Sequence, residues 1–126
     1  MTKQVEKTQE VACLIDADRT KQLFSGRFDG CRCHKAFPDQ MQTYLGNCDG
    51  DGVLVVCVPE GDVRFPSESY KGMYIIAVVC ENVSADYLEY LEDSNISYIF
   101  AGKDSQNINT IVRRLENDFG IKQVIL

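Results

Sequence analysis

The sequence lacks two features that would each assign a broad class of partner. It contains no apolar run close to the length of a membrane-spanning helix. It also lacks a basic balance, because its formal net charge is -6, whereas nucleic acids and anionic membrane surfaces are bound by basic patches. We therefore expect neither a nucleic acid nor a membrane as a partner. A small anionic ligand stays compatible with this charge, since a local group of backbone N–H donors can bind an anion in an acidic protein.

We expect no secretory signal either. The first ten residues, MTKQVEKTQE, are polar and mixed in charge, unlike the apolar centre of a signal peptide. The six cysteines are therefore expected to be reduced thiols in the cytoplasm. Cys57 and Cys80 stand inside apolar segments, where we expect them to behave as small hydrophobic residues.

Nucleotide-binding and hydrolase motifs are also missing. No G-x-G-x-x-G follows a predicted strand, and Gly102-Lys103 has neither the preceding glycine nor the following Ser/Thr of a phosphate-binding P-loop. The single histidine, His34, has no nucleophile at a recognisable spacing. The sequence therefore gives no support for a hydrolase triad.

Two segments imitate metal-binding motifs. Cys31-Arg32-Cys33-His34, with Cys13 or Cys48, offers four soft ligands for zinc, but only one residue separates the paired cysteines, where structural zinc sites place two to four. A surface loop is the simpler interpretation. The segment from Asn47 to Gly52 resembles the opening of an EF-hand loop, but Val58 occupies the position of the bidentate glutamate. A tight turn before a strand is the favoured interpretation there.

The second half of the chain alternates between strand and helix patterns. Met73–Cys80, Ser97–Ala101 and Ile121–Leu126 are short apolar runs typical of strands covered on both faces. Ser84 can begin a helix through Leu91. The simplest interpretation of the acidic residues on this helix is a solvent-exposed face (Glu89, Glu92 and Asp93). Asp104 or Ser105 can begin a second helix that ends at Gly120, with one apolar stripe (Ile108, Ile111, Val112, Leu115 and Phe119). Strands alternating with helices predict a parallel sheet.

The first half is less regular. Residues 1–10 are expected to be a flexible lead-in, and Val11–Ile15 to be a first strand. Asp16–Lys35 is predicted as loop with a short helix at most. The remaining expectations are a short helix from Pro38 or Asp39 that includes Met41, Tyr44 and Leu45, a turn over Gly46–Gly52, a strand over Val53–Val58 and a loop over Asp62–Gly72. We expect one domain of 126 residues, irregular over 11–52 and regular over 53–126.

The predicted strand ends are the best candidate site. Pro59-Glu60, Glu81-Asn82 and Gly102-Lys103-Asp104-Ser105 each follow a strand, and parallel strands bring such turns to one edge of a sheet. Helix N-termini favour phosphate there, and Lys103 could add a positive charge. Ordinary turn and capping chemistry is the alternative interpretation.

From about Val53 to Leu126 the chain resembles the dihydrofolate-reductase-like superfamily, and within it the pyrimidine reductases of riboflavin biosynthesis. The likeness is carried by the segments VLVVCVPEGDV, MYIIAVVCENVSADYLEYLEDSNISYIFAG and NINTIVRRLENDFGIKQVIL. Its most specific part is NISYIFAGKDS followed by an amphipathic helix and FGIKQVIL. The resemblance implies an α/β/α sandwich with a mostly parallel sheet, NADPH as cofactor, and hydride transfer to a ribosylamino-pyrimidine or similar small substrate. By position, it implies cofactor contacts from eight residues near strand ends: Val58, Pro59, Glu60, Cys80, Glu81, Ala101, Gly102 and Lys103.

The chain departs from this family at both ends. Family members continue past the last strand into a glutamate-glycine-glycine loop that holds the cofactor's diphosphate, whereas this sequence stops at Leu126. The family's glycine-rich cofactor turn and its opening substrate loop have no match in residues 1–50. We therefore keep two interpretations, a shortened NADPH-dependent reductase and a non-catalytic binding or assembly domain that forms a homodimer through its terminal strand. A zinc module built on Cys31–His34 is the weakest third.

Overall fold

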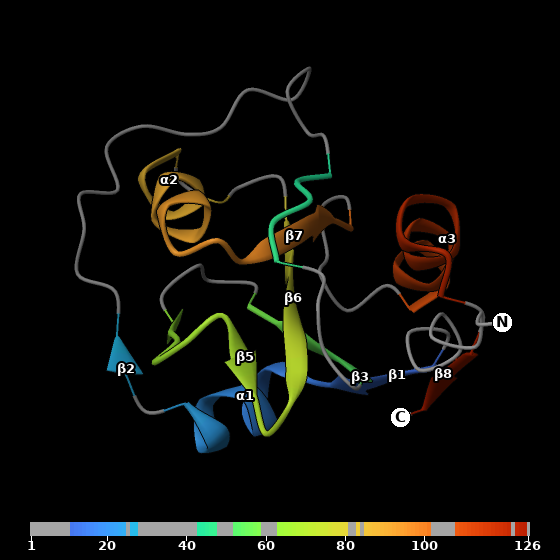
Figure 1. Ribbon diagram of the computed structural model, residues 1–126, viewed down its shortest axis with the longest axis horizontal. Helices are drawn as coiled ribbons and strands as arrows, with labels where there is room; N and C mark the ends of the chain where they lie inside the picture. Colours follow the sequence, from blue (N-terminus) through green and yellow to red (C-terminus); the bar gives the residue numbers. More distant parts are fainter. Residues whose placement is uncertain are drawn as a thin grey trace, which may run out of the picture.

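The protein is an α/β domain built on a mostly parallel sheet, seen in a computed structural model (Figure 1). The structure describes residues 11–24, 26–27, 43–47, 52–58, 63–80, 83, 85–101, 108–121 and 123–125. The predictions for residues 1–10, for Cys31–His34, for Pro38, Asp39 and Met41, and for the caps at Ser84, Asp104 and Ser105 lie outside this part of the chain.

Five strands run in the same direction and form the centre of the sheet. They are β1 (Val11–Ile15), β3 (Gly52–Cys57), β6 (Met73–Val79), β7 (Ser97–Phe100) and β8 (Gln123–Ile125). Their order across the sheet is β7-β6-β3-β1-β8, and every neighbouring pair is parallel. The α/β class and the parallel sheet expected from the sequence are confirmed.

Helices contact both faces of this sheet. On one face, Tyr87 and Leu91 of α2 (Ala85–Asp93) and Phe24, just after α1 (Ala17–Leu23), pack in a hydrophobic core with alternate strand residues such as Val56. On the other face, Ile111 and Leu115 of α3 (Ile108–Phe119) pack on the residues in between, such as Val55. Figure 1 shows α2 and α3 on opposite sides of the strands. A chain whose crossovers share one handedness must place its helices this way when the strand order reverses direction.

The helix ends follow their sequence signals. Asp16 caps α1 by accepting a hydrogen bond from the Arg19 N–H at 2.9 Å. Gly120 follows α3 with φ of 71°, as predicted for a glycine at this position. Asn95 ends the turn after α2 with φ of 62°, and the next N–H, of Ile96, bonds to the Leu91 carbonyl at 2.9 Å.

Three predictions for irregular segments are wrong. The segment expected to be a loop over Asp62–Gly72 contains β4 (Val63–Arg64) and β5 (Ser69–Tyr70). β4 pairs with β2 (Gly26–Arg27), which lies where a loop with at most a short helix was expected. β5 forms an antiparallel hairpin with the start of β6.

Tyr44 and Leu45 are not helical, so the predicted short helix that includes them is the third wrong prediction. Tyr44 forms an antiparallel bridge with Tyr98, and the two backbones exchange hydrogen bonds of 3.0 and 3.1 Å. Their rings are stacked, with centroids 5.4 Å apart. The edge of β7 offers unpaired backbone groups that a helix at Tyr44 would leave unused, and this pairing prevails over the local apolar spacing.

Candidate functional site at the end of strand β1

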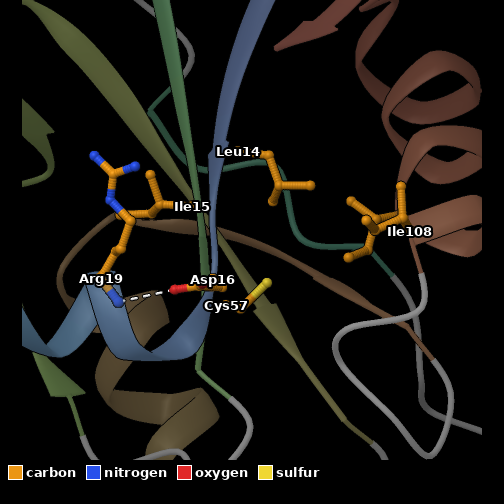
Figure 2. A pocket seen from close by; sticks show the side chains of 7 residues that line it. Leu14, Ile15, Asp16, Arg19, Cys57 and Ile108 are labelled. Atoms are coloured by element: carbon orange, nitrogen blue, oxygen red, sulfur yellow. Dashed lines mark hydrogen bonds between the residues drawn. The ribbon is translucent and has the colours of Figure 1, made fainter. Parts of the chain in front are cut away.

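A cavity of about 300 Å³ opens at the carboxyl end of β1 (Figure 2). This volume is at the lower end of the range for small-molecule pockets. Its walls come from the ends of β1 and β3 and from the first turns of α1 and α3, and its lining residues are Leu14, Ile15, Asp16, Arg19, Cys57, Ile108 and Ile111.

The topology explains why a cavity forms here. The chain leaves β1 through α1 toward β3 on one side, and it reaches β8, on the other side of β1, through α3. The two helices lie on opposite faces, so their first turns diverge at the tip of β1. Such a reversal of strand order is where open α/β sheets bind their ligands.

The cavity joins both faces of the sheet. Figure 2 shows Leu14 directed toward Ile108 of α3, whereas Ile15 and Arg19 lie on the other side of β1. Ile15 belongs to the core on the α2 side, and Leu14 belongs to the core on the α3 side. Cys57, the last residue of β3, is buried and contributes its thiol to the wall.

The polar groups of the cavity stand at the start of α1. Asp16 is fixed by its capping bond and by its carbonyl, which accepts from the Thr20 hydroxyl at 2.8 Å and the Thr20 N–H at 2.9 Å. Thr20 is completely buried, so this turn is anchored in the protein interior. Arg19 and Asp16 are both exposed. The arrangement offers one fixed carboxylate, one guanidinium and an apolar wall to a small ligand with a flat apolar body and a polar edge.

The strand ends predicted from the sequence lie side by side, next to this cavity. The Val58 N–H bonds to the Val78 carbonyl at 2.9 Å, and the Ala101 N–H bonds to the Val79 carbonyl at 3.0 Å, which brings the ends of β3, β6 and β7 together. The side chains of Val58, Cys80 and Ala101 are buried, and none of them lines the cavity. Pro59, Glu60, Glu81, Gly102 and Lys103 lie outside the described residues, so their assignment as cofactor contacts stays a prediction.

The residues of β1 and α1 that line the cavity were not predicted from the sequence. The signal was present in VACLI followed by Asp16, which is an apolar strand with a capping residue directly after it. It was missed because the position of β1, between β3 and β8, depends on pairings with distant segments. Ile108 was expected in the buried stripe of α3, but it is 44% exposed and faces the cavity instead.

Metal chemistry finds no support in the part of the chain that the structure describes. Within those ranges, no three His, Cys, Asp or Glu side chains gather as a metal site. The segment predicted as a turn or calcium loop leads directly into β3, where an EF-hand would require a helix. The same ranges contain no helix that is both long and apolar enough to cross a membrane.

Comparison of the chain with protein-family models, with curated proteins and with solved structures finds no match.

Proposed function

We propose that the protein is a reductase of the dihydrofolate-reductase-like type, which binds NADPH along the carboxyl edge of its parallel sheet and a small heterocyclic substrate in the cavity at β1. One observation carries the proposal: a cavity lies at the point where the strand order reverses, beside three aligned strand ends. The resemblance of residues 53–126 to the pyrimidine reductases of riboflavin biosynthesis supports the same assignment. A ribosylamino-pyrimidine is then the substrate class, and the cytoplasm is the expected compartment.

The chain's own groups suit this role. NADPH supplies the hydride, so the protein's task is to orient the two reactants and exclude water. The apolar wall of Leu14, Ile108 and Ile111 favours a flat ring. The Asp16 carboxylate accepts hydrogen bonds and Arg19 donates them, and these are the groups that a pyrimidine edge with amino and carbonyl substituents requires.

The test is a titration of NADPH followed by cofactor fluorescence, with two variants of the same helix. Ile108→Trp fills the cavity from a side chain that is already partly exposed, and substrate turnover should fall at least about 10-fold. Val112→Trp is the matched control, because Val112 is also partly exposed on α3 but does not line the cavity. It should keep the activity of the unaltered protein.

Saturable NADPH binding at micromolar concentration, with a selective loss of turnover in Ile108→Trp, is the expected result. A dissociation constant of about 1 mM corresponds to a binding free energy of only about 4 kcal/mol. If NADPH shows no binding at that concentration, the reductase assignment is wrong.

A second function has its own supporting observation. On its outer edge, β8 pairs with no strand among the described residues, and Ile125 on this strand is 49% exposed. Cys13, its register partner on β1, is exposed on the same face. An unprotected edge of this kind pairs readily with another strand, so a non-catalytic assembly domain that forms a homodimer through β8 is the alternative. Its test is the mass of the protein in solution.

A further inference from the structure

A second cavity, of about 340 Å³, lies at the opposite edge of the sheet. Its walls come from the end of α1 (Leu23 and Phe24), from Gly26 of β2, from the segment Arg64–Pro66 and from Tyr70 of β5. β5 pairs with Met73 and Tyr74, the first residues of β6. This aromatic cleft therefore lies at the amino edge of the sheet, away from the carboxyl-edge cavity.

Three aromatic rings build the cleft. Phe24 and Phe65 are buried with centroids 4.9 Å apart, and Phe24 and Tyr70 are 5.4 Å apart, both pairs edge to face. Tyr70 is only partly buried, so its ring is the one that an incoming molecule can reach. Aromatic surfaces of this kind favour a flat, unsaturated ring over an aliphatic group of equal size.

The rim of the cleft is basic, although the protein as a whole is acidic. Arg64 lines the cleft, the Lys71 ammonium stands 5.4 Å from the centre of the Tyr70 ring, and Arg27 follows Gly26 in β2. Among the described residues of this region, the acid Glu68 is directed toward Asn95, whose side-chain nitrogen lies 3.5 Å from its carboxylate. In a chain with net charge -6, this excess of positive charge among the described residues of the rim favours an anionic group.

Arg64 is held in place by a contact of its own side chain and by hydrogen bonds of the two residues next to it in the chain. Its guanidinium carbon lies over the Tyr90 ring, 5.0 Å from the ring centre. The residue after it, Phe65, donates its N–H to the Tyr90 hydroxyl at 2.7 Å, and the residue before it, Val63, accepts from the Tyr87 hydroxyl. A cation–π contact of this kind uses none of the guanidinium's N–H donors for a hydrogen bond to the ring's substituents, and these donors suit a phosphate. Arg64 is thus pre-positioned, which lowers the entropy lost on binding.

We propose that the aromatic cleft is a second ligand site, which takes a planar aromatic ring joined to a phosphate, as in a nucleoside monophosphate. The ring lies against Tyr70 and the phosphate is bound by Arg64, with Lys71 adding a second positive charge. This inference does not depend on the reductase activity, because no residue of the cleft lines the cavity at β1.

The experiment is isothermal titration calorimetry with AMP as the probe. AMP should bind with one site, and adenosine and ribose 5-phosphate, which each carry half of the recognised chemistry, should both bind at least about 10-fold more weakly. Arg64→Gln should weaken AMP about 10-fold or more, since it removes a charge-assisted pair. Tyr70→Leu should weaken it about 3- to 10-fold by removing the ring.

Two controls locate the effect. Arg113→Gln makes the same change of charge on the exposed surface of α3 and should leave AMP affinity unchanged. Ile108→Trp should also leave it unchanged, because that residue lies in the other cavity. Failure of AMP to saturate the protein below about 10 mM, or equal affinity in Arg64→Gln and Arg113→Gln, would overturn the proposal.

Discussion

At the scale of single residues, the contact between Tyr98 and Glu92 is a feature that local spacing does not predict. The Tyr98 hydroxyl donates to the Glu92 carboxylate at 2.6 Å, and the ring is nearly buried. Burial, and then the hydrogen bond and charge of Glu92, raise the pKa of Tyr98 well above its usual value. Glu92 was expected to belong to a solvated helix face, and it is exposed. Its partner six residues later is reached only through the turn at Asn95.

This raised pKa predicts a loss of stability in alkali. Above about pH 10 the unfolded chain releases the Tyr98 proton while the native state keeps it, so the native state binds more protons and stability falls as pH rises. Tyr98→Phe should cost about 1 kcal/mol at pH 8. At pH 11 this cost should have disappeared, because the unaltered protein loses about 1 kcal/mol of stability there that Tyr98→Phe does not lose. Urea unfolding at both pH values measures this.

Glu92→Gln is the companion variant, because it removes the charge but keeps an acceptor for the hydroxyl. Burial still raises the pKa of Tyr98 in that variant, so an intermediate pH dependence is expected. Equal slopes with pH in the unaltered protein and in Tyr98→Phe would contradict the assignment.

At the scale of elements, the hairpin between β5 and β6 turns through two residues with positive φ. Lys71 has φ of 51° and Gly72 has φ of 84°, which are the angles of a type I′ turn. Glycine adopts this conformation freely, but lysine does so at a cost, whereas asparagine is favoured at the first position.

Lys71→Asn should therefore stabilise the protein by about 0.5 kcal/mol, and Gly72→Ala should destabilise it by about 1 kcal/mol. The midpoint of urea unfolding is the measurement, with an unchanged slope as the check on two-state behaviour. Destabilisation by Lys71→Asn would mean that the contact of Lys71 with the Tyr70 ring outweighs the gain in the turn.

Elements with strong internal patterns could be predicted from the sequence, and those that depend on distant partners could not. The apolar runs of β3, β6 and β7 and the stripe of α3 are local signals, and each element appears within a few residues of its expected bounds. β2, β4 and β5 have two residues each. Such short strands form only because other segments pair with them, so no local sequence pattern predicts them.

At the scale of the whole molecule, the outer edge of β8, which pairs with none of the other described strands, has a measurable consequence. If two copies pair through this edge, the mass in solution should double as concentration rises, and Ile125→Lys should return the protein to a monomer, because charged residues protect edges from pairing. Ile125 is already half exposed, so the variant should fold normally. A constant monomer mass for the unaltered protein at high concentration would exclude this assembly.

The parallel sheet could be predicted at this scale, but the cavity at β1 could not. Alternating strands and helices are enough to predict parallel pairing, and the aligned ends of β3, β6 and β7 follow from it. The cavity depends on β1 lying between β3 and β8, and that order follows from which strand the chain returns to after α3. The short apolar segment after α3 contains no pattern that identifies β1 as the strand beside it.

The interior position of β1 also affects how the chain is synthesised. The ribosome releases β1 before any other described strand, yet one of its two neighbours, β8, is the last strand described. Until β8 has been synthesised, the edge of β1 that later pairs with β8 has no partner strand. Partly synthesised proteins with such unpaired edges aggregate or bind chaperones. Completion of this sheet therefore waits for the synthesis of β8, and nascent chains that stop before β8 should be selectively insoluble.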